Sequence, residues 1–199
     1  MDDKPQLILI AGPNGSGKST ITNQLMSQGL DFGIYINPDE IAARLTGDDI
    51  NKAKQAQAIA EKQRHSLLQK GVSHSFESVM SHPSKVEYMV TAKAKGFHVT
   101  LVFVGIDDPA INVQRVQNRV KKGGHAVPID KIIQRYKRTM ELLFDATQVA
   151  DDVMIFDNTD MDNSMRLVAK LRNGDLINYE KGVPWLQKHF VKKFEKQKW

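Results

Sequence analysis

The residues from Gly12 to Ser19 read Gly-Pro-Asn-Gly-Ser-Gly-Lys-Ser and could bind the phosphates of a nucleoside triphosphate. They match the phosphate-loop pattern G-x-x-x-x-G-K-[ST] at every fixed position. Glycines there let backbone N–H groups turn toward phosphate oxygens, and a helix that begins at the loop adds its partial positive charge. Lys18 would reach the β- and γ-phosphates, and the Ser19 hydroxyl would bind Mg²⁺. The predicted ATP-binding residues are Gly12, Pro13, Asn14, Gly15, Ser16, Gly17, Lys18, Ser19 and Thr20.

Two carboxylates further along the chain could act on the group that receives the phosphate. Asp39 follows an expected strand, and ligands of a parallel sheet lie beyond the carboxyl ends of its strands, so Asp39 should lie near Lys18. It could accept the proton of an attacking hydroxyl, or it could only stabilise the first turn of a helix. Glu77, also at a strand end, could hold a Mg²⁺-bound water, bind a sugar hydroxyl or lie in solvent. Ser78 beside it is a further candidate contact for the acceptor.

A basic segment runs from Arg115 to Arg138 and holds eight lysines or arginines against one acid. Arg115 and Arg119 share a face of one expected helix at spacing i, i+4, and Arg135 and Arg138 share a face of the next at i, i+3. Two basic helices joined by a Gly-Gly pair could close as a lid and stabilise the charge of a transferring phosphoryl group. A solvated basic face is the structural alternative. The candidate catalytic residues are therefore Lys18, Asp39, Arg119 and Arg135, and Arg138 and Arg44 are candidate substrate contacts.

These residues need a parallel sheet to bring them together. Strands alternate with helical segments, which predicts an α/β fold of the P-loop NTPase type: a kinase-like, five-stranded parallel sheet with helices on both faces. A tight turn at Asn173-Gly174 and an amphipathic segment at 184–194 predict a C-terminal hairpin and helix, over about 164–199. The expected strands are 7–11, 34–36, 73–79, 98–105 and 153–156; the expected helices include 53–70, 84–95, 108–122 and 130–149.

Length and composition limit the alternatives. The 199 residues suit one domain, with a lid over about 115–138. The sequence has no cysteine, which excludes disulfides, thiolate zinc sites and cysteine nucleophiles. No apolar stretch approaches the ~20 residues that span a bilayer, and the acidic start shows no signal peptide, so we expect a cytoplasmic protein without a membrane partner. The net charge of +5 lies partly in the basic segment, where it suits nucleotide phosphates.

Several ordered motifs together resemble the zeta toxin family of P-loop kinases, and in particular its short, single-domain bacterial members. These motifs are GPNGSGKST, Ile36-Asn-Pro-Asp-Glu-Ile-Ala42, Phe76-Glu-Ser78, Arg119-Val-Lys-Lys-Gly-Gly-His-Ala-Val-Pro128 and Ile132-Ile-Gln-Arg-Tyr136, within a resemblance from about Leu7 to Asn158. The resemblance implies ATP- and Mg²⁺-dependent phosphoryl transfer to a small-molecule hydroxyl. It also implies that Asp39 is the base and that Arg119 and Arg135 neutralise the transferred phosphate.

The best-known members of that family phosphorylate UDP-N-acetylglucosamine, and the resemblance implies a nucleotide sugar of this kind as the acceptor. Their Glu-Gly-Thr motif is matched only in part, by Glu77-Ser78-Val79. The family resemblance also makes an antitoxin-type protein a candidate partner. Two other functions stay open from the residues alone: a nucleotide-binding regulatory protein with slow ATP hydrolysis, and a nucleic-acid end kinase. The two acids on the acceptor side argue against a nucleic-acid substrate.

Overall fold

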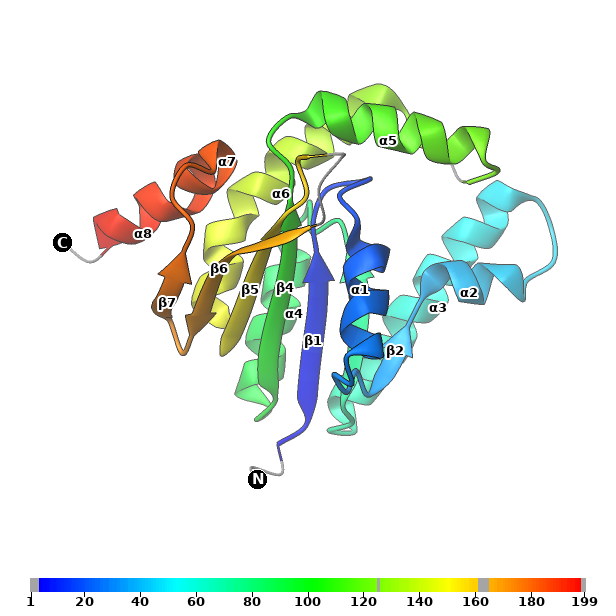
Figure 1. Ribbon diagram of the computed structural model, residues 1–199. Helices are drawn as coiled ribbons and strands as arrows, with labels where there is room; N and C mark the ends of the chain where they lie inside the picture. The colour runs from blue at the N-terminus through cyan, green and yellow to red at the C-terminus, as the bar shows by residue number, and fades with distance from the viewer. Residues whose placement is uncertain (1–3, 125, 161–164, 198–199) are drawn as a thin grey trace.

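A single mixed sheet lies at the centre of the molecule, with helices packed around it (Figure 1). The computed structural model describes residues 4–124, 126–160 and 165–197. Within these ranges the strand order is β2-β3-β1-β4-β5-β6-β7, with the first five parallel and the last two antiparallel. The strands are β1 Gln6–Ala11, β2 Ile34–Ile36, β3 His74–Ser78, β4 His98–Gly105, β5 Asp152–Asp157, β6 Arg166–Arg172 and β7 Asp175–Tyr179.

The predicted α/β P-loop kinase fold is confirmed, with one correction. The sheet has seven strands in the described part of the chain rather than five, because the C-terminal hairpin pairs with β5 and extends the sheet. An open edge strand has unpaired N–H and C=O groups, and β6 satisfies those of β5. The hairpin turn is the one expected: Asn173 and Gly174 both have positive φ, at 50° and 81°, which matches the twist of the flanking strands.

Helices cover both faces of the sheet (Figure 1). On one face α1 packs on a core that includes Ile8, Ile10 and Val104. On the other, α3, α4 and α6 pack on a larger core around Leu9, Leu101 and neighbouring apolar residues. The helices are α1 Lys18–Ser27, α2 Pro38–Ala43, α3 Asp49–Gln69, α4 Ser84–Ala94, α5 Pro109–Lys121 and α6 Ile129–Val149. Across the described ranges, none of them is long and apolar enough to cross a membrane.

The C-terminal helical segment is fastened to the middle of the sheet. It consists of α7 Pro184–Leu186, a π-helical turn Gln187–Val191 and α8 Lys192–Gln197. The Trp185 ring lies against Gly105 so closely that a Cβ at that glycine would meet it at 2.2 Å. The Trp185 Nε1–H donates a 2.8 Å hydrogen bond to Asp157, the last residue of β5. The extension therefore packs on the strands whose ends form the candidate site.

Candidate active site

The loop between β1 and α1 has the backbone geometry of a phosphate loop. Gly15 and Gly17 have φ of 72° and 99°, conformations that favour glycine. A Cβ at Gly12 would meet the Val104 carbonyl oxygen at 2.3 Å, so the neighbouring strand also requires glycine there. The Lys18 Nζ donates hydrogen bonds to the carbonyls of Gly12 and Pro13, at 2.9 and 3.0 Å. Lys18 is therefore held over the loop into which phosphates would fit.

Burial makes the charged form of the Lys18 side chain less favourable. Desolvation lowers its pKa to about 8; the Glu77 carboxylate opposes the shift, and the Arg119 cation adds to it. Among the described residues, only carbonyl oxygens accept hydrogen bonds from Lys18, and a desolvated cation of this kind gains strongly when an anion arrives. Phosphate oxygens bound in the loop would therefore stabilise the charged form of Lys18.

Glu77 accepts hydrogen bonds from three hydroxyl groups. Ser19 Oγ donates to its Oε2 at 2.9 Å, while Thr22 Oγ1 and the Tyr35 hydroxyl donate to its Oε1 at 2.8 and 2.9 Å. Burial and the Glu77 charge raise the pKa of Tyr35, so the phenol stays protonated and donates. The Glu77 carboxylate is therefore held beside the Ser19 hydroxyl, at the start of α1.

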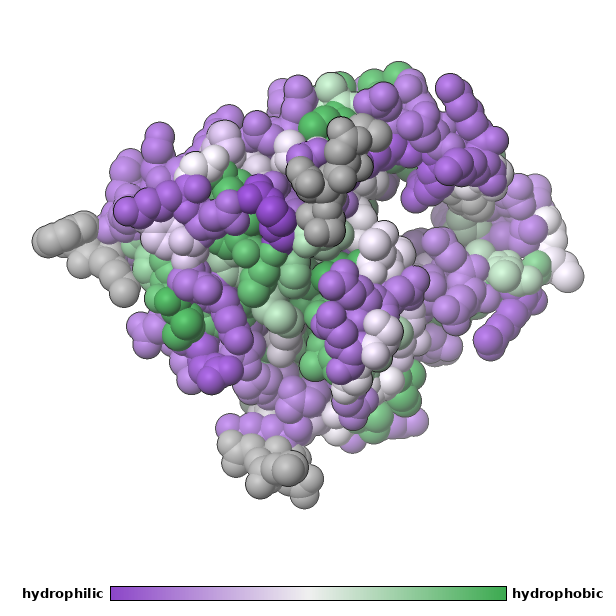
Figure 2. Space-filling model, in the orientation of Figure 1, coloured by the Kyte–Doolittle hydropathy of each residue, from purple (hydrophilic) through white to green (hydrophobic). Residues whose placement is uncertain are grey.

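A cleft of about 1080 Å³ brings most of the predicted residues together. Figure 2 shows an opening at this place, between α5 and the pair α2 and α3. Arg44, at the end of α2, and Arg138, on α6, are exposed and are not among the lining residues. The predicted residues that do line the cleft are Asn14, Gly15, Gly17, Lys18, Ser19, Thr20, Asp39, Glu77, Ser78, Arg119 and Arg135.

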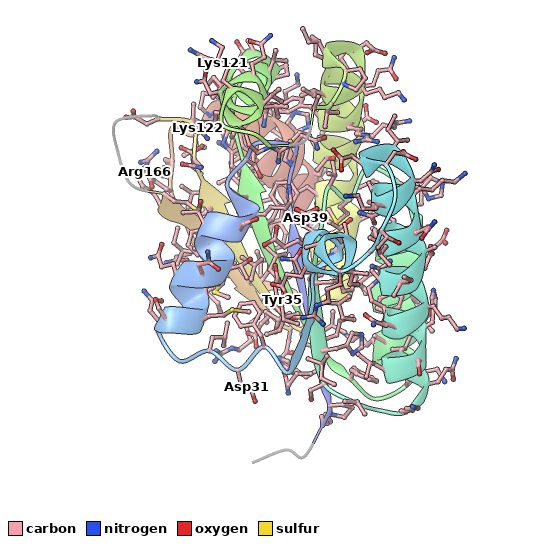
Figure 3. The ribbon with its side chains drawn as sticks, turned by 90° about the vertical axis from the view of Figure 1, so that its right-hand side faces the viewer. Asp31, Tyr35, Asp39, Lys121, Lys122 and Arg166 are labelled. Atoms are coloured by element: carbon pink, nitrogen blue, oxygen red, sulfur yellow. The ribbon has the colours of Figure 1, made fainter. Side chains whose placement is uncertain are left out.

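Asp39 reaches the cleft from the first turn of α2. Asn37 caps this helix by accepting the Asp39 backbone N–H at 3.0 Å, and Pro38 occupies the first helical position. Figure 3 shows Asp39 above Tyr35, on the side where α5 ends at Lys121 and Lys122. The cap holds the backbone of Asp39 while its exposed carboxylate faces the cleft.

Helices α5 and α6 carry the predicted arginines over the cleft. Arg119 and Arg135 both line it, one from each helix. A Cβ at Gly124 would meet the Arg119 Cγ at 2.6 Å, so the connection passes directly against this side chain. The Tyr136 hydroxyl donates to the carbonyls of Ile106 and Asp107, both at 2.8 Å, which ties α6 to the end of β4. His125, within the motif of the expected lid, lies outside the described residues.

Comparison with known proteins agrees with this geometry. The family model described as zeta toxin matches residues 1–168, well over half of the chain. The chain belongs to the zeta toxin family. A curated protein that is similar in sequence is an uncharacterized protein of Haemophilus influenzae, 35% identical over 136 residues, which are 65% of this chain and 91% of that protein.

Solved structures show the same fold as this zeta toxin family chain. The complex of AvrRxo1-ORF1 and AvrRxo1-ORF2, solved with ATP, contains a chain that matches with a TM-score of 0.72 at 16% identity, over 94% of this chain. The present chain spans 63% of that chain's length. The PezAT toxin–antitoxin system of Streptococcus pneumoniae gives a TM-score of 0.60 at 19% identity, over 98% of this chain and 85% of the other.

The phosphate loop of this zeta toxin family chain has supports that sequence reasoning missed. Asn112 on α5 donates from Nδ2 to the Asn14 carbonyl at 2.6 Å. Asn158, directly after β5, donates to the Ser16 carbonyl at 2.8 Å and also lines the cleft. The place of Asn158 beyond a strand end was the only signal that could have indicated it. Arg115 lines the cleft beside them, and its buried Nη1 has no hydrogen-bond partner among the described residues.

Proposed function

We propose that this protein transfers the γ-phosphoryl group of ATP to a hydroxyl group of a small molecule. The observation that carries the proposal is the composition of the cleft. It places the phosphate-loop residues Lys18 and Ser19, the carboxylate Asp39 and the arginines Arg119 and Arg135 around one space. Phosphoryl transfer depends mainly on positioning and on stabilising charge, and these are the groups it requires. Membership of the zeta toxin family supports the same reaction class.

The residues present fit a bound triphosphate. Positive φ angles turn the loop backbone into a concave cradle at Gly15 and Gly17. Lys18 has a lowered pKa that an anion would restore. Within the described part of the chain, the buried Ser16 Oγ and Arg115 Nη1 have no hydrogen-bond partner, and both could donate to phosphate oxygens. The ATP complex among the similar structures supports ATP as the nucleotide.

Magnesium fits the pair formed by Ser19 and Glu77. No group of three or more His, Asp or Glu that could hold a metal ion occurs among the described residues, so Mg²⁺ would be bound with the help of the nucleotide phosphates, as is common in kinases. When bound, the ion neutralises charge on the β- and γ-phosphates. The Ser19 hydroxyl would contact it, and Glu77 would orient Ser19 and accept hydrogen bonds from coordinated water.

In the proposed step, the acceptor hydroxyl oxygen forms a bond to the γ-phosphorus while the bond to the bridging oxygen of ADP breaks. Asp39 accepts the hydroxyl proton as the new bond forms. Lys18, Arg119 and Arg135 stabilise the negative charge on the transferring group and on ADP. We also propose that α5 and α6 act as a lid that brings their arginines to the phosphates and excludes water.

Two details of the proposal rest on the family rather than on the cleft. A nucleotide sugar such as UDP-N-acetylglucosamine is a candidate acceptor. An antitoxin-type protein is a candidate partner, because the PezAT structure describes a toxin–antitoxin system. A screen of acceptors tests the nucleotide sugar, and co-purification from the native cell tests the protein partner.

The test is an ATP-consumption screen against nucleotide sugars, free sugars, nucleosides and aminoglycosides. We expect one acceptor class to stimulate ADP release, and Asp39→Asn to reduce transfer by about 10²- to 10⁴-fold while ATP binding is kept. The neighbouring Glu40→Gln is the matched control, because Glu40 lies on the same helical turn but does not line the cleft. Near-normal transfer by Asp39→Asn would remove its role as base. ATP turnover that no acceptor stimulates would favour a regulatory protein instead.

A further inference from the structure

The wall of the cleft formed by α3 and α4 is basic. Lys54 and Arg64 line it from α3, and Lys85 lines it from the first turn of α4. Glu61 is the single carboxylate that α3 and α4 contribute to the lining. This wall belongs neither to the phosphate loop nor to the helices with the catalytic arginines. The wall lies on the acceptor side of the cleft, so an inference about its ligand rests on the proposed function.

Arg64 is an unusual residue in this wall because it is buried and has no anionic partner in the part of the chain that the structure describes. Its relative exposure is 6%, and its guanidinium carbon lies 4.6 Å from the centroid of the Phe76 ring. Among the described residues, no carboxylate oxygen lies within 4.0 Å of its nitrogens. A contact with an aromatic ring offsets only part of the desolvation cost of a buried cation.

Lys85 shares this environment. Burial lowers the pKa of Lys85, the neighbouring Arg64 cation adds to the shift, and Glu61 opposes it. Burial also lowers the pKa of Arg64, again opposed by Glu61. A second cavity of about 220 Å³ between α3 and α4 is lined by the same Glu61, Arg64 and Lys85. The two cations thus lie where two cavities meet, and the Arg64 cation disfavours the charge of Lys85.

A purely structural role explains this arrangement poorly. The Arg64 carbonyl accepts a hydrogen bond from the Tyr88 hydroxyl at 2.8 Å, but any residue at this position would offer the same carbonyl. An apolar side chain of similar length would cover Phe76 without the cost of burying a charge. The planar guanidinium becomes favourable when an anion accepts its hydrogen bonds.

We propose that Arg64 and Lys85 form an anion subsite that binds a phosphate or carboxylate group of the acceptor. The acceptor of the proposed transfer is then itself an anion, with its hydroxyl toward Asp39 and its anionic group toward α3 and α4. The sequence placed two carboxylates, Asp39 and Glu77, on the acceptor side, which would repel an anionic acceptor, but in the structure Glu77 does not face the acceptor. Glu77 accepts hydrogen bonds from Ser19, Thr22 and Tyr35, so its charge belongs to the donor side of the cleft.

The test titrates inorganic phosphate into the full chain saturated with Mg²⁺ and a non-hydrolysable ATP analogue, so that the phosphate loop is occupied. We expect saturable phosphate binding in calorimetry. Arg64→Met should weaken it by about tenfold or more, because it removes charge-assisted hydrogen bonds. Lys62→Met is the matched control, since Lys62 is an exposed cation of α3 outside the cleft, and it should bind phosphate normally.

Further arms make each outcome decisive. Lys85→Met should also weaken phosphate binding. It replaces Arg64→Met as the test variant if circular dichroism shows that Arg64→Met does not fold. Acetate in place of phosphate distinguishes a carboxylate-bearing from a phosphate-bearing acceptor. Absence of saturable binding of both ions, or equal binding by wild type and both variants, overturns the subsite.

The titration is separable from the test of the proposed function. Repeating it on Lys18→Ala without nucleotide removes the loop lysine, so the dependence on Arg64 can be read even if nucleotide binding fails. Loss of nucleotide binding, or full activity in Asp39→Asn, would instead contradict the kinase proposal and leave the phosphate result unchanged.

Discussion

Glu77 links the side chains that surround the start of α1. Its two carboxylate oxygens accept hydrogen bonds from Ser19, Thr22 and Tyr35, which come from the phosphate-loop helix and from β2. A carboxylate that accepts three hydrogen bonds is held in one orientation. This places a fixed negative charge beside the hydroxyl that is proposed to contact Mg²⁺.

The first prediction concerns this charge. Glu77→Gln keeps the size of the side chain but removes the anion, so the orientation of Ser19 and the affinity for Mg²⁺ should suffer. We expect kinase activity to fall by about 10- to 100-fold at limiting Mg²⁺, with partial recovery at high Mg²⁺. A magnesium titration of initial rates measures this. Glu87→Gln on α4, outside the cleft, is the control, and an unchanged Mg²⁺ dependence in Glu77→Gln would contradict the prediction.

The second prediction follows from the pKa of Lys18, which burial lowers to about 8 in the nucleotide-free protein. Bound phosphates should raise that pKa, so ATP binding near pH 8 should take up about half a proton, and binding near pH 6 almost none. Calorimetry in buffers of different ionisation enthalpy measures this uptake. Proton release at pH 8, or an uptake equal at the two pH values, would show that Lys18 is not the titrating group.

The same shift affects stability, with a sign that can be stated. Because the folded-state pKa lies below the ordinary value of 10.5, the unfolded chain binds more protons than the folded one between about pH 8 and pH 10.5. The Lys18 contribution therefore opposes folding at neutral pH and disappears as the pH rises through this window. The phosphate loop is thus destabilised without its ligand, which is the cost of having a cation ready for phosphate.

At the scale of elements, glycine and proline made most boundaries readable from sequence. The expected strand over 98–105 coincides with β4, and the expected helix over 84–95 with α4. The expected helix over 53–70 begins earlier, at Asp49, because Asp48 accepts the backbone N–H of Asn51 as an N-cap. Local signals of this kind can be found in a sequence, although this one was overlooked.

The parts of the site that were not predicted depend on contacts between distant segments. Lys18, Asp39 and Glu77 could be placed together because parallel strands end at one edge. Nothing near Arg64 in the sequence indicates that its guanidinium lies over Phe76, because that contact requires α3 to pack on β3. The hydrogen bond from Asn158 to the loop likewise requires the strand order, which the sequence pattern does not contain.

The third prediction concerns the connection between α5 and α6. Gly124→Ala would place a Cβ 2.6 Å from the Arg119 Cγ and 3.1 Å from its carbonyl oxygen, so Arg119 must move. We expect kcat to fall by about tenfold, the cost of misplacing one catalytic group, with ATP affinity nearly unchanged. A double-mutant cycle with Arg119→Ala tests whether Gly124→Ala lowers kcat by displacing Arg119. If Gly124→Ala acts through Arg119, the double variant should be no slower than Arg119→Ala alone.

On the scale of the whole molecule, the C-terminal extension and the phosphate loop meet at the end of β5. Asp157 accepts hydrogen bonds from Trp185 and Thr159 and forms an ion pair with Arg166. The next residue, Asn158, donates to the phosphate loop. The hairpin and the terminal helix therefore support the same strand end that supports the nucleotide site, although they contribute none of the residues that line the cleft.

The last prediction separates this support from the chemistry. Trp185→Phe removes the 2.8 Å hydrogen bond to Asp157 and also the outer indole carbons, Cζ2, Cζ3 and Cη2, that lie against Gly105. The free energy of unfolding should fall by about 2–4 kcal/mol, because a buried acceptor loses one donor and the missing ring atoms leave a cavity. Asp157 keeps its contacts with Thr159 and Arg166, so Asn158 should stay in place and ATP affinity should change by no more than about twofold.

Urea unfolding and nucleotide titration on the same sample measure both effects of Trp185→Phe. Ile177→Val, an exposed change on β7, should alter neither. A loss of ATP affinity without a loss of stability would mean that Trp185 acts on the phosphate loop directly, rather than through the stability of the sheet.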